Sequence, residues 1–244
     1  MAIRDDLRGI CYIALKDMKA YYLKPSAISW GILLPIALGL AFYLRSPEGF
    51  RDLVPGLVAM AVLFSTTAME AVVIDSELRI GALERLFSAP ISTAAVLMGK
   101  VLGAVLFGLA VSLVVTIVSV VGLGLLQWSL LWLLPVLLLS ALVFSGLGAF
   151  IAVSVREVFK GQTVANFVRF PMIFLCGVFS PLSSLPLVLR GIAYLLPLTY
   201  TVEGIQNAVA SFSLGAILVD LLVLVAFAAL FLALALVILR RRLA

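Results

Sequence analysis

Long apolar runs, separated by short charged segments, occupy most of the chain from residue 26 onward. A run of about 20 apolar residues is long enough to cross a hydrocarbon core of about 30 Å as a helix. The runs lack the alternation of apolar and polar residues that a membrane β-barrel requires. They predict six membrane-spanning helices, at about 26–44, 53–74, 96–121, 131–153, 164–180 and 214–239.

Residues 1–24 have a different pattern, which predicts an amphipathic helix lying in the membrane interface. Apolar side chains recur there on one helical stripe: Ile3, Leu7, Ile10, Cys11, Ala14, Leu15, Met18 and Tyr22. Most charged residues fall off that stripe: Asp5, Asp6, Arg8, Lys16, Asp17 and Lys19. The charges spread over the whole segment and a full-length apolar run follows, so a cleaved signal peptide is not expected.

The segment 181–213 is apolar but is interrupted by Pro181, Pro186, Arg190, Pro197 and Glu203. The interruptions argue against a seventh span and predict two short helices, at about 185–196 and 200–210. These helices are expected to dip into the outer leaflet or lie on it as a re-entrant hairpin. Irregular backbone at that depth must be surrounded by protein or water, so the hairpin should pack in the interior or over its mouth.

The composition agrees with an all-α polytopic membrane protein that forms a single domain over residues 1–244. Apolar residues make up 64% of the chain and charged residues 12%, against roughly half and a quarter in soluble domains. The chain has no histidine, which excludes histidine metal sites, Ser–His catalysis and imidazole proton relays. Cys11 and Cys176 lie too far apart in sequence to indicate a disulfide framework or a metal site.

The positions of the basic residues predict the orientation in the cell membrane. With the N-terminus inside, fourteen basic residues fall on the cytoplasmic side: Arg4, Arg8, Lys16, Lys19, Lys24, Arg79, Arg85, Lys100, Arg156, Lys160, Arg169, Arg240, Arg241 and Arg242. Only Arg45, Arg51 and Arg190 fall outside. This bias follows the positive-inside rule and places both termini in the cytoplasm. It also explains the net charge of +5 without a nucleic-acid partner.

A charged island from Asp75 to Pro90 separates the second and third apolar runs. Apolar residues within it recur at helical spacing: Ile80, Leu83, Leu86 and Phe87. The spacing predicts a helix of about three turns with one apolar face. An ordinary interfacial loop helix would show the same spacing, so the pattern alone leaves that alternative open.

Two motifs carry a family resemblance. The first is Glu77-Leu78-Arg79-x-Gly81-x-x-Glu84-Arg85-Leu86-x-x-x-Pro90, which resembles the coupling-helix region of ABC transporter type 2 permeases, closest to the daunorubicin-resistance and nodulation-export branch. Many relatives outside that branch have a glutamate where this chain has Arg79. The second is Phe179-Ser180-Pro181-Leu182-Ser183-Ser184-Leu185-Pro186, followed by Pro197-Leu198-Thr199-Tyr200-x-x-Glu203-Gly204-Ile205, which is similar to the outer re-entrant region of the family.

The resemblance implies the permease half of an exporter for an amphiphilic drug, lipid or glycan-type substrate. Two permease copies, as a homodimer or a pair with a related permease, would work with two copies of an ABC ATPase subunit. The implied coupling residues are Glu77, Arg79, Gly81, Leu83, Glu84, Arg85, Leu86, Phe87 and Pro90. The chain lacks the phosphate-loop motif, since Gly99-Lys100 has no upstream glycine. ATP and Mg are therefore expected on the partner, and no cofactor on this chain.

Several polar and aromatic residues inside the predicted spans are candidates for lining a substrate path. Phe167, Phe170 and Phe174 form a stripe with Asn166 and Arg169 beside it, and Ser65, Thr66 and Thr67 follow one another in the second span. Helix packing and helix–helix hydrogen bonds are the alternative explanation for both groups. Glu70 and Asp220 are acids inside predicted spans, where such residues tend to be partnered or functional. A structural role is favoured for both.

Two other classes of membrane protein fit the sequence less well. An intramembrane enzyme needs paired acids, a nucleophile with its base, or a metal cluster. The nearest candidate is Ser145-Gly146-Leu147-Gly148, which has no histidine to serve it. A passive channel would show a ring-forming charged stripe or a filter-like glycine loop. The sequence shows neither, so a permease that is not itself an enzyme is the preferred interpretation.

Overall fold

The computed structural model describes residues 3–45, 49–87, 90–123, 128–155, 160–209 and 212–243, and these ranges contain helices and no strands. The helices are α1 (Ile3–Asp17), α2 (Pro25–Arg45), α3 (Phe50–Arg79), α4 (Ala82–Phe87), α5 (Thr93–Leu123), α6 (Leu133–Ser154), α7 (Lys160–Leu175), α8 (Leu187–Ala193), α9 (Pro197–Val209) and α10 (Leu214–Leu243). A π-helical stretch, Met18–Tyr22, follows α1, and 3₁₀ turns occupy Trp128–Trp132 and Leu182–Ser184.

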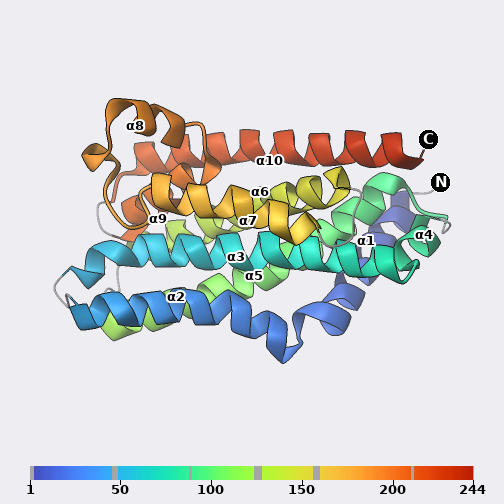
Figure 1. The fold of residues 1–244 in the computed structure, drawn as a ribbon, viewed down its shortest axis with the longest axis horizontal. Coiled ribbons are helices and arrows are strands. Elements are labelled where there is room, and N and C mark those ends of the chain that lie inside the picture. The colour runs from blue at the N-terminus through green and yellow to red at the C-terminus, as the bar shows by residue number, and fades with distance from the viewer. Residues whose placement is uncertain are drawn as a thin grey trace.

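The long helices α2, α3, α5, α6, α7 and α10 run along one axis, with the short elements gathered at the two ends (Figure 1). Helices α8 and α9 cover one end, whereas α1, α4 and both chain ends lie at the other. Helix α3 packs against α2, α5 and α6, and α10 packs along α6. The predicted all-helical architecture is confirmed.

Four described helical segments are long and apolar enough to cross a membrane: Phe50–Ile74, Thr93–Ser119, Leu130–Ser154 and Leu214–Arg241. The described apolar part of α2, Leu33–Arg45, is shorter, and α7 has 16 residues. The chain is therefore a polytopic membrane protein. The full count of six spans stays a prediction.

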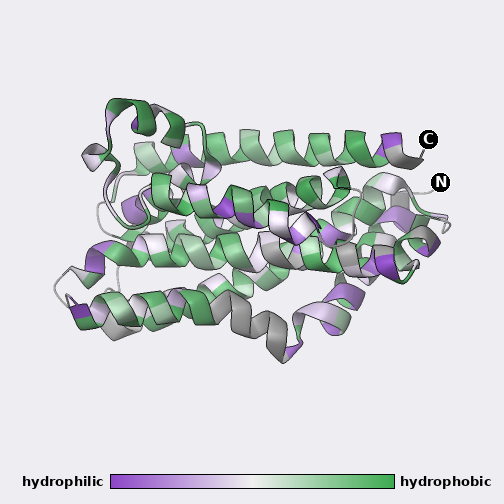
Figure 2. Cartoon of the chain, viewed as in Figure 1, coloured by the Kyte–Doolittle hydropathy of each residue, from purple (hydrophilic) through white to green (hydrophobic). Residues whose placement is uncertain are grey.

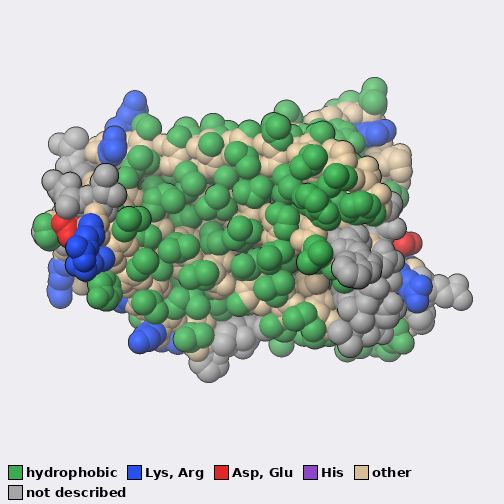
Figure 3. Space-filling view, turned by 180° about the vertical axis from the view of Figure 1, so that it is seen from behind, with side chains coloured by type: hydrophobic (Ala, Val, Ile, Leu, Met, Phe, Trp, Pro, Cys, Tyr) green, Lys and Arg blue, Asp and Glu red, His purple; other side chains and the backbone are tan. Residues whose placement is uncertain are grey.

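The surface has the polarity expected of such a protein. Apolar residues colour the middle of the long helices, and hydrophilic residues collect towards the ends (Figure 2). Seen from behind, a broad hydrophobic band separates charged groups at the two ends (Figure 3). Helix α10 contributes exposed Leu218, Leu222, Val225 and Leu230 to the apolar surface.

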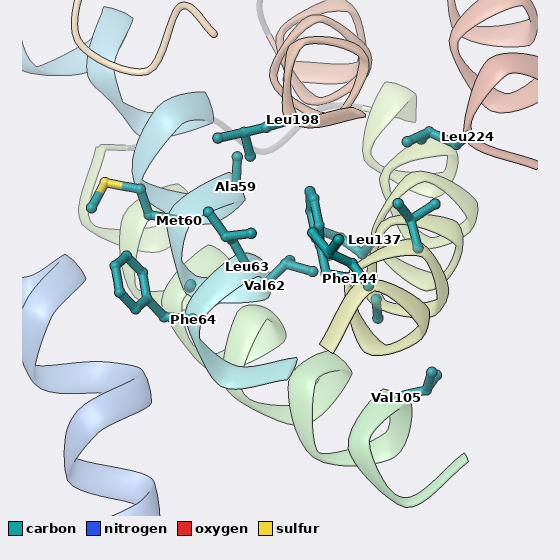
Figure 4. Packing of buried hydrophobic residues seen from close by; sticks show 14 of the residues in the cluster. Ala59, Met60, Val62, Leu63, Phe64, Val105, Leu137, Phe144, Leu198 and Leu224 are labelled. Carbon is teal, nitrogen blue, oxygen red and sulfur yellow. The ribbon is translucent and has the colours of Figure 1, made fainter. Parts of the chain in front are cut away.

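The core is built around α3. Figure 4 shows Val62 and Leu63 of α3 close to Leu137 and Phe144 of α6. Lipid is as apolar as these side chains, so close packing rather than escape from water holds such helices together. A Cβ atom at Gly56 of α3 would lie 2.3 Å from the carbonyl oxygen of Val178. Only glycine permits this approach between α3 and the segment after α7.

The helix boundaries differ from the prediction in two places. The predicted helix over 75–90 is divided, because α3 continues to Arg79 and only Ala82–Phe87 forms a separate helix. The predicted span 164–180 is replaced by α7 ending at Leu175, and the chain then turns at Gly177, whose φ is 81°. The other long helices match their predicted ranges to within a few residues. Helices α8 and α9 lie close to the ranges predicted for the two short helices.

Helix α1 packs differently from the predicted stripe. Its contact face towards α5 carries Ile13, Ala14 and Asp17, all buried, while Leu7 and Leu15 of the predicted stripe are exposed. A Cβ atom at Gly99 of α5 would lie 2.8 Å from Cβ of Ile13. The helix therefore docks closely against α5 with a face beside the predicted stripe, and much of the stripe itself stays exposed.

Candidate functional site

The turn between α3 and α4 depends on a glycine in the left-handed conformation. Gly81 has φ +65°, a region that glycine enters without the steric cost that other residues pay. The backbone N–H of Arg85 donates to the Gly81 carbonyl at 3.4 Å. A Cβ atom at Gly81 would meet nothing within 4 Å. Within this chain the glycine thus serves the conformation of the backbone.

Helix α4 is anchored in the bundle by only part of its predicted apolar face. Leu83 is 6% exposed, and Leu86 and Phe87 are half-buried against the core. Ile80, by contrast, is 64% exposed at the turn, and Arg85 is exposed. The turn and one side of α4 therefore face outward from the end of the bundle.

The remaining residues implied as coupling residues lie in different surroundings. Arg79 and Pro90 are exposed, whereas Glu77 is fully buried in the last turn of α3. The side chain of Glu84 and residues 88–89 are outside the described part of the structure. Glu77 therefore belongs to the interior of the bundle, where the sequence had suggested a loop helix.

Glu77 belongs to a cluster of four charges, called here the charge cluster: Lys16 and Asp17 of α1, Glu77 of α3 and Lys100 of α5. Lys100 Nζ donates to Glu77 Oε2 and lies 3.4 Å from Asp17 Oδ2. Lys16 Nζ donates to Glu77 Oε1 and lies 3.0 Å from Asp17 Oδ1. Lys16 is half-exposed and the other three are buried. The cluster thus ties three helices together at the end that carries α4.

Burial and pairing act on the two carboxylates of the cluster in opposite ways. Burial raises the pKa of Asp17 above its ordinary value despite Lys100 and Lys16. Burial also acts to raise the pKa of Glu77, but Lys100 and Lys16 outweigh it and hold that pKa below the ordinary value. Glu77 is therefore the anion around which the two lysines are arranged. Two cations and two carboxylates give the cluster no net charge when all four are ionised.

Glu70 lies deeper along α3. Tyr22 Oη donates to Glu70 Oε2 at 3.3 Å, and the Tyr22 ring stacks on Phe107 of α5 at 5.2 Å. Glu70 Oε1 has no hydrogen-bond partner among the described residues. The sequence favoured a structural role for Glu70 but named no partner for it. It is fully buried, and its partner is the last residue of the π-helical stretch.

A second attachment holds the beginning of α1 against α5. The Ser92 backbone N–H donates to Asp6 Oδ1 at 2.9 Å, and this bond lowers the pKa of Asp6. Ser92 Oγ in turn accepts from the Ala95 backbone N–H at 3.1 Å, which is the usual N-cap arrangement. Helix α1 is therefore fixed to α5 near both of its ends.

The predicted path-lining residues of α3 are occupied with packing. Ser65, Thr66 and Thr67 are fully buried, and each hydroxyl donates to a backbone carbonyl one turn earlier in α3. A Cβ atom at Gly108 of α5 would lie 2.1 Å from Thr66 Cγ2. The hydroxyls therefore make hydrogen bonds inside one helix rather than between helices, and a path-lining role for these residues stays a prediction.

The α7 candidates are exposed, in contrast to those of α3. Phe167 is 75% exposed, Phe170 and Phe174 are also exposed, and Asn166 is half-buried. These three phenylalanines are called here the aromatic face of α7. Arg169, counted from the sequence with the cytoplasmic charges, is instead buried within α7, with its Cζ atom 5.2 Å from the Phe64 ring centroid.

The opposite end of the bundle carries the predicted outer residues. Pro181 and Pro186 are exposed and Pro197 is buried at the start of α9. Tyr200 Oη donates to the Tyr194 carbonyl at 2.9 Å. Glu203 lines a cavity of about 500 Å³ with Asp220.

Asp220 has a partner across this cavity. Asn207 Nδ2 donates to Asp220 Oδ2 at 3.3 Å, and Asp220 is buried. The bond joins α9 to α10 and agrees with the structural role favoured for Asp220.

Comparison with known proteins bears on the whole chain. The model of the ABC-2 type transporter family matches residues 8–210, a range that begins in α1 and ends just after α9. The chain belongs to the ABC-2 type transporter family. The match includes α4 with its Gly81 turn, the charge cluster and the α8–α9 end.

Two named permeases are similar to this chain. The probable multidrug ABC transporter permease YbhS of Escherichia coli K12 is 29% identical over 194 residues, which are 78% of this chain and 52% of that protein. The inner membrane transport permease YadH of the same strain is 30% identical over 154 residues, 63% of this chain and 60% of that protein. The matched regions thus span only about half of these relatives' length.

Proposed function

We propose that the chain is the membrane-spanning permease of an ATP-driven exporter for an amphiphilic drug, lipid or glycan-type substrate. The observation that carries the proposal is membership of the ABC-2 type transporter family together with a helix, α4, held at one end of the bundle by a glycine turn. The names of the relatives as transport permeases support the same class.

In this proposal α4 is the contact for a separate ATPase subunit. Leu83 anchors the helix in the core, while exposed Ile80 and Arg85 offer an apolar and a cationic contact. Movement of α4 would pull on the end of α3, and Glu77 would pass it through the charge cluster to α1 and α5. Glu84, Arg79 and Pro90 complete the proposed coupling region.

The proposed assembly contains two permease copies and two ATPase subunits, which hold ATP and Mg. The exposed aromatic face of α7 suits a second copy or an amphiphilic substrate better than water. The membrane orientation proposed from the charge bias puts α4 in the cytoplasm and the α8–α9 hairpin at the outer leaflet. In that orientation α2, α3, α5, α6, α7 and α10 supply the six spans.

Cysteine labelling tests this topology. In a Cys11→Ala background, which removes the exposed native thiol, Ser184→Cys and Ser213→Cys are expected to react with a membrane-impermeant maleimide on intact cells. Ile80→Cys at the other end should react only after permeabilisation. Protection of Ser213→Cys together with reaction of Ile80→Cys on intact cells would reverse the proposed orientation.

Purification tests the division of labour. The chain purified alone from a heterologous membrane is expected to hydrolyse no ATP above an empty-membrane control. The same tagged chain isolated from its native membrane should carry an ATPase whose activity is sensitive to vanadate. Robust hydrolysis by the chain alone would overturn the proposal that a separate subunit handles ATP.

A further inference from the structure

A buried arginine lies in the middle of the bundle, away from the charge cluster. Arg169 of α7 is 1% exposed. Its Nε donates to the Ala165 carbonyl at 3.1 Å, and its Cζ atom lies 5.2 Å from the Phe64 ring centroid. Phe64 lies midway along the apolar segment Phe50–Ile74 of α3. The guanidinium therefore lies level with the middle of that apolar segment.

The described surroundings leave this guanidinium incompletely satisfied. A guanidinium carries five N–H donors and stays charged in proteins. Nη2 of Arg169 is buried and has no hydrogen-bond partner in the described structure. The ion pairs found among the described residues all belong to the charge cluster, so no described carboxylate lies within 4 Å of Arg169. An aromatic ring and one carbonyl replace only part of the water that such a cation loses.

Two other polar side chains of α7 lie on the same face of the helix as Arg169. Gln162 and Asn166 stand seven and three residues before Arg169, a spacing that places all three on one helical face. Gln162 Oε1 is likewise buried without a partner among the described residues. Two polar groups on one face of α7 therefore lack a hydrogen-bond partner among the described residues. Buried polar atoms that lack a partner in the chain can be satisfied by a water, an ion or the polar group of a ligand.

These polar side chains border the aromatic face of α7. Phe170 packs edge-on against Phe64 with ring centroids 6.2 Å apart, so the ring over Arg169 is continuous with that exposed face. Phe167 and Phe174 extend the apolar surface along the helix. A cationic group thus lies directly beside a surface that suits an acyl chain or a flat apolar ring system.

We propose that Arg169 binds the anionic head group, a phosphate or a carboxylate, of the amphiphile that this permease moves. The planar fork of arginine matches both anions through two parallel hydrogen bonds. The apolar part of the amphiphile lies on Phe167 and Phe174, and Gln162 and Asn166 contact the polar part. The inference rests on the proposed transport function and narrows its substrate class to anionic amphiphiles.

Equilibrium binding to the purified full-length chain in phosphatidylcholine nanodiscs tests this site. The probes share one chain and differ in the head: oleyl phosphate, oleate, oleylamine and oleyl alcohol. The two anions are expected to bind at least tenfold more tightly than the amine and the alcohol. Arg169→Gln should remove this preference and leave binding of the alcohol unchanged. Equal binding of all four probes, or an anion preference that survives Arg169→Gln, would overturn the proposal.

Control variants separate binding from folding. Arg190→Gln removes an exposed guanidinium from α8 and should leave the anion preference intact. Arg169→Lys keeps the charge without the fork and should lose only part of it, so it replaces Arg169→Gln if that variant does not fold. Loss of a buried unpaired cation should also leave the melting temperature of the ligand-free protein unchanged or raised. A clear fall in melting temperature with unchanged anion preference would assign Arg169 to packing alone and overturn the proposal.

The same assay tests the source of the anion, and its outcome is independent of the test of the transport proposal. Inorganic phosphate that competes as strongly as oleyl phosphate would show a site for a free anion and overturn the amphiphile assignment. The binding assay requires neither ATP nor a partner. Its failure therefore overturns the Arg169 site alone, whereas failure of the ATPase purification overturns the transport proposal.

Discussion

Replacement of Lys100 by methionine is expected to be the most destabilising substitution at the charged end of the bundle. Lys100 is 2% exposed and contacts both Glu77 and Asp17. Its loss would leave two buried carboxylates with only the half-exposed Lys16 as a cation. Removing one partner of a buried ion pair typically costs about 3–5 kcal/mol. Unfolding in mixed detergent micelles, followed by circular dichroism, measures this loss.

Two further variants distinguish pairing from a general loss of a lysine. Lys19→Met removes an exposed lysine close to the end of α1 and should change stability by less than about 0.5 kcal/mol, as surface substitutions usually do. Adding Glu77→Met to Lys100→Met should recover part of the lost stability, because it removes one of the two carboxylates that the first substitution leaves with only Lys16 as a cation. The effects of substitutions at contacting residues are not additive. If Lys100→Met proves as mild as Lys19→Met, the charge cluster does not hold the helices together.

Gly81→Val is expected to abolish coupling between this chain and the proposed ATPase subunit while the bundle stays folded. Valine at φ +65° is disfavoured, since the left-handed conformation costs about 1–2 kcal/mol for an L-residue and β-branched residues tolerate it worst. The turn will therefore change shape and carry α4 out of position. Substrate-stimulated ATP hydrolysis by the co-purified complex should fall at least tenfold.

The conformational cause can be separated from the volume of the new side chain. Gly81→Asn should retain most of the coupling, because asparagine enters the left-handed region more readily than other residues. Nothing lies within 4 Å of a Cβ at this position. A difference between the valine and asparagine variants therefore does not come from a clash of the Cβ atom inside this chain. Full substrate-stimulated hydrolysis by Gly81→Val would show that this turn does not transmit the motion.

The long helices could be predicted from the sequence because the length of an apolar run depends on local composition alone. The division of 75–90 could not, since it depends on the φ angle of one glycine. From the sequence alone, Gly81 could be either a tolerated residue inside one helix or the turn between two helices. The prediction ended the second helix with its apolar run at residue 74. Helix α3 continues past that run to Arg79, because Glu77 is buried and paired inside the bundle.

The charge cluster was missed for a different reason. Asp17, Glu77 and Lys100 come from three helices, and no periodicity in one sequence segment brings them together. One signal was present: a lysine inside the start of one apolar run and a glutamate just after the preceding run, both in need of a partner. Arg169 carried the same signal within α7, but it was counted as a marker of orientation.

The docking of α1 on α5 also constrains how the chain matures. The two bonds that fix α1 to α5, at Ser92 and at Lys100, join residues 86 and 83 positions apart. During synthesis α1 therefore cannot dock until α2 and α3 have been made and α5 has followed them. Until α5 arrives, Asp17 and Glu77 have only Lys16 as a cation, and the docking edge of α1 stays uncovered. A docked α1 is thus the mark of a nascent chain in which α3 and α5 are both in place.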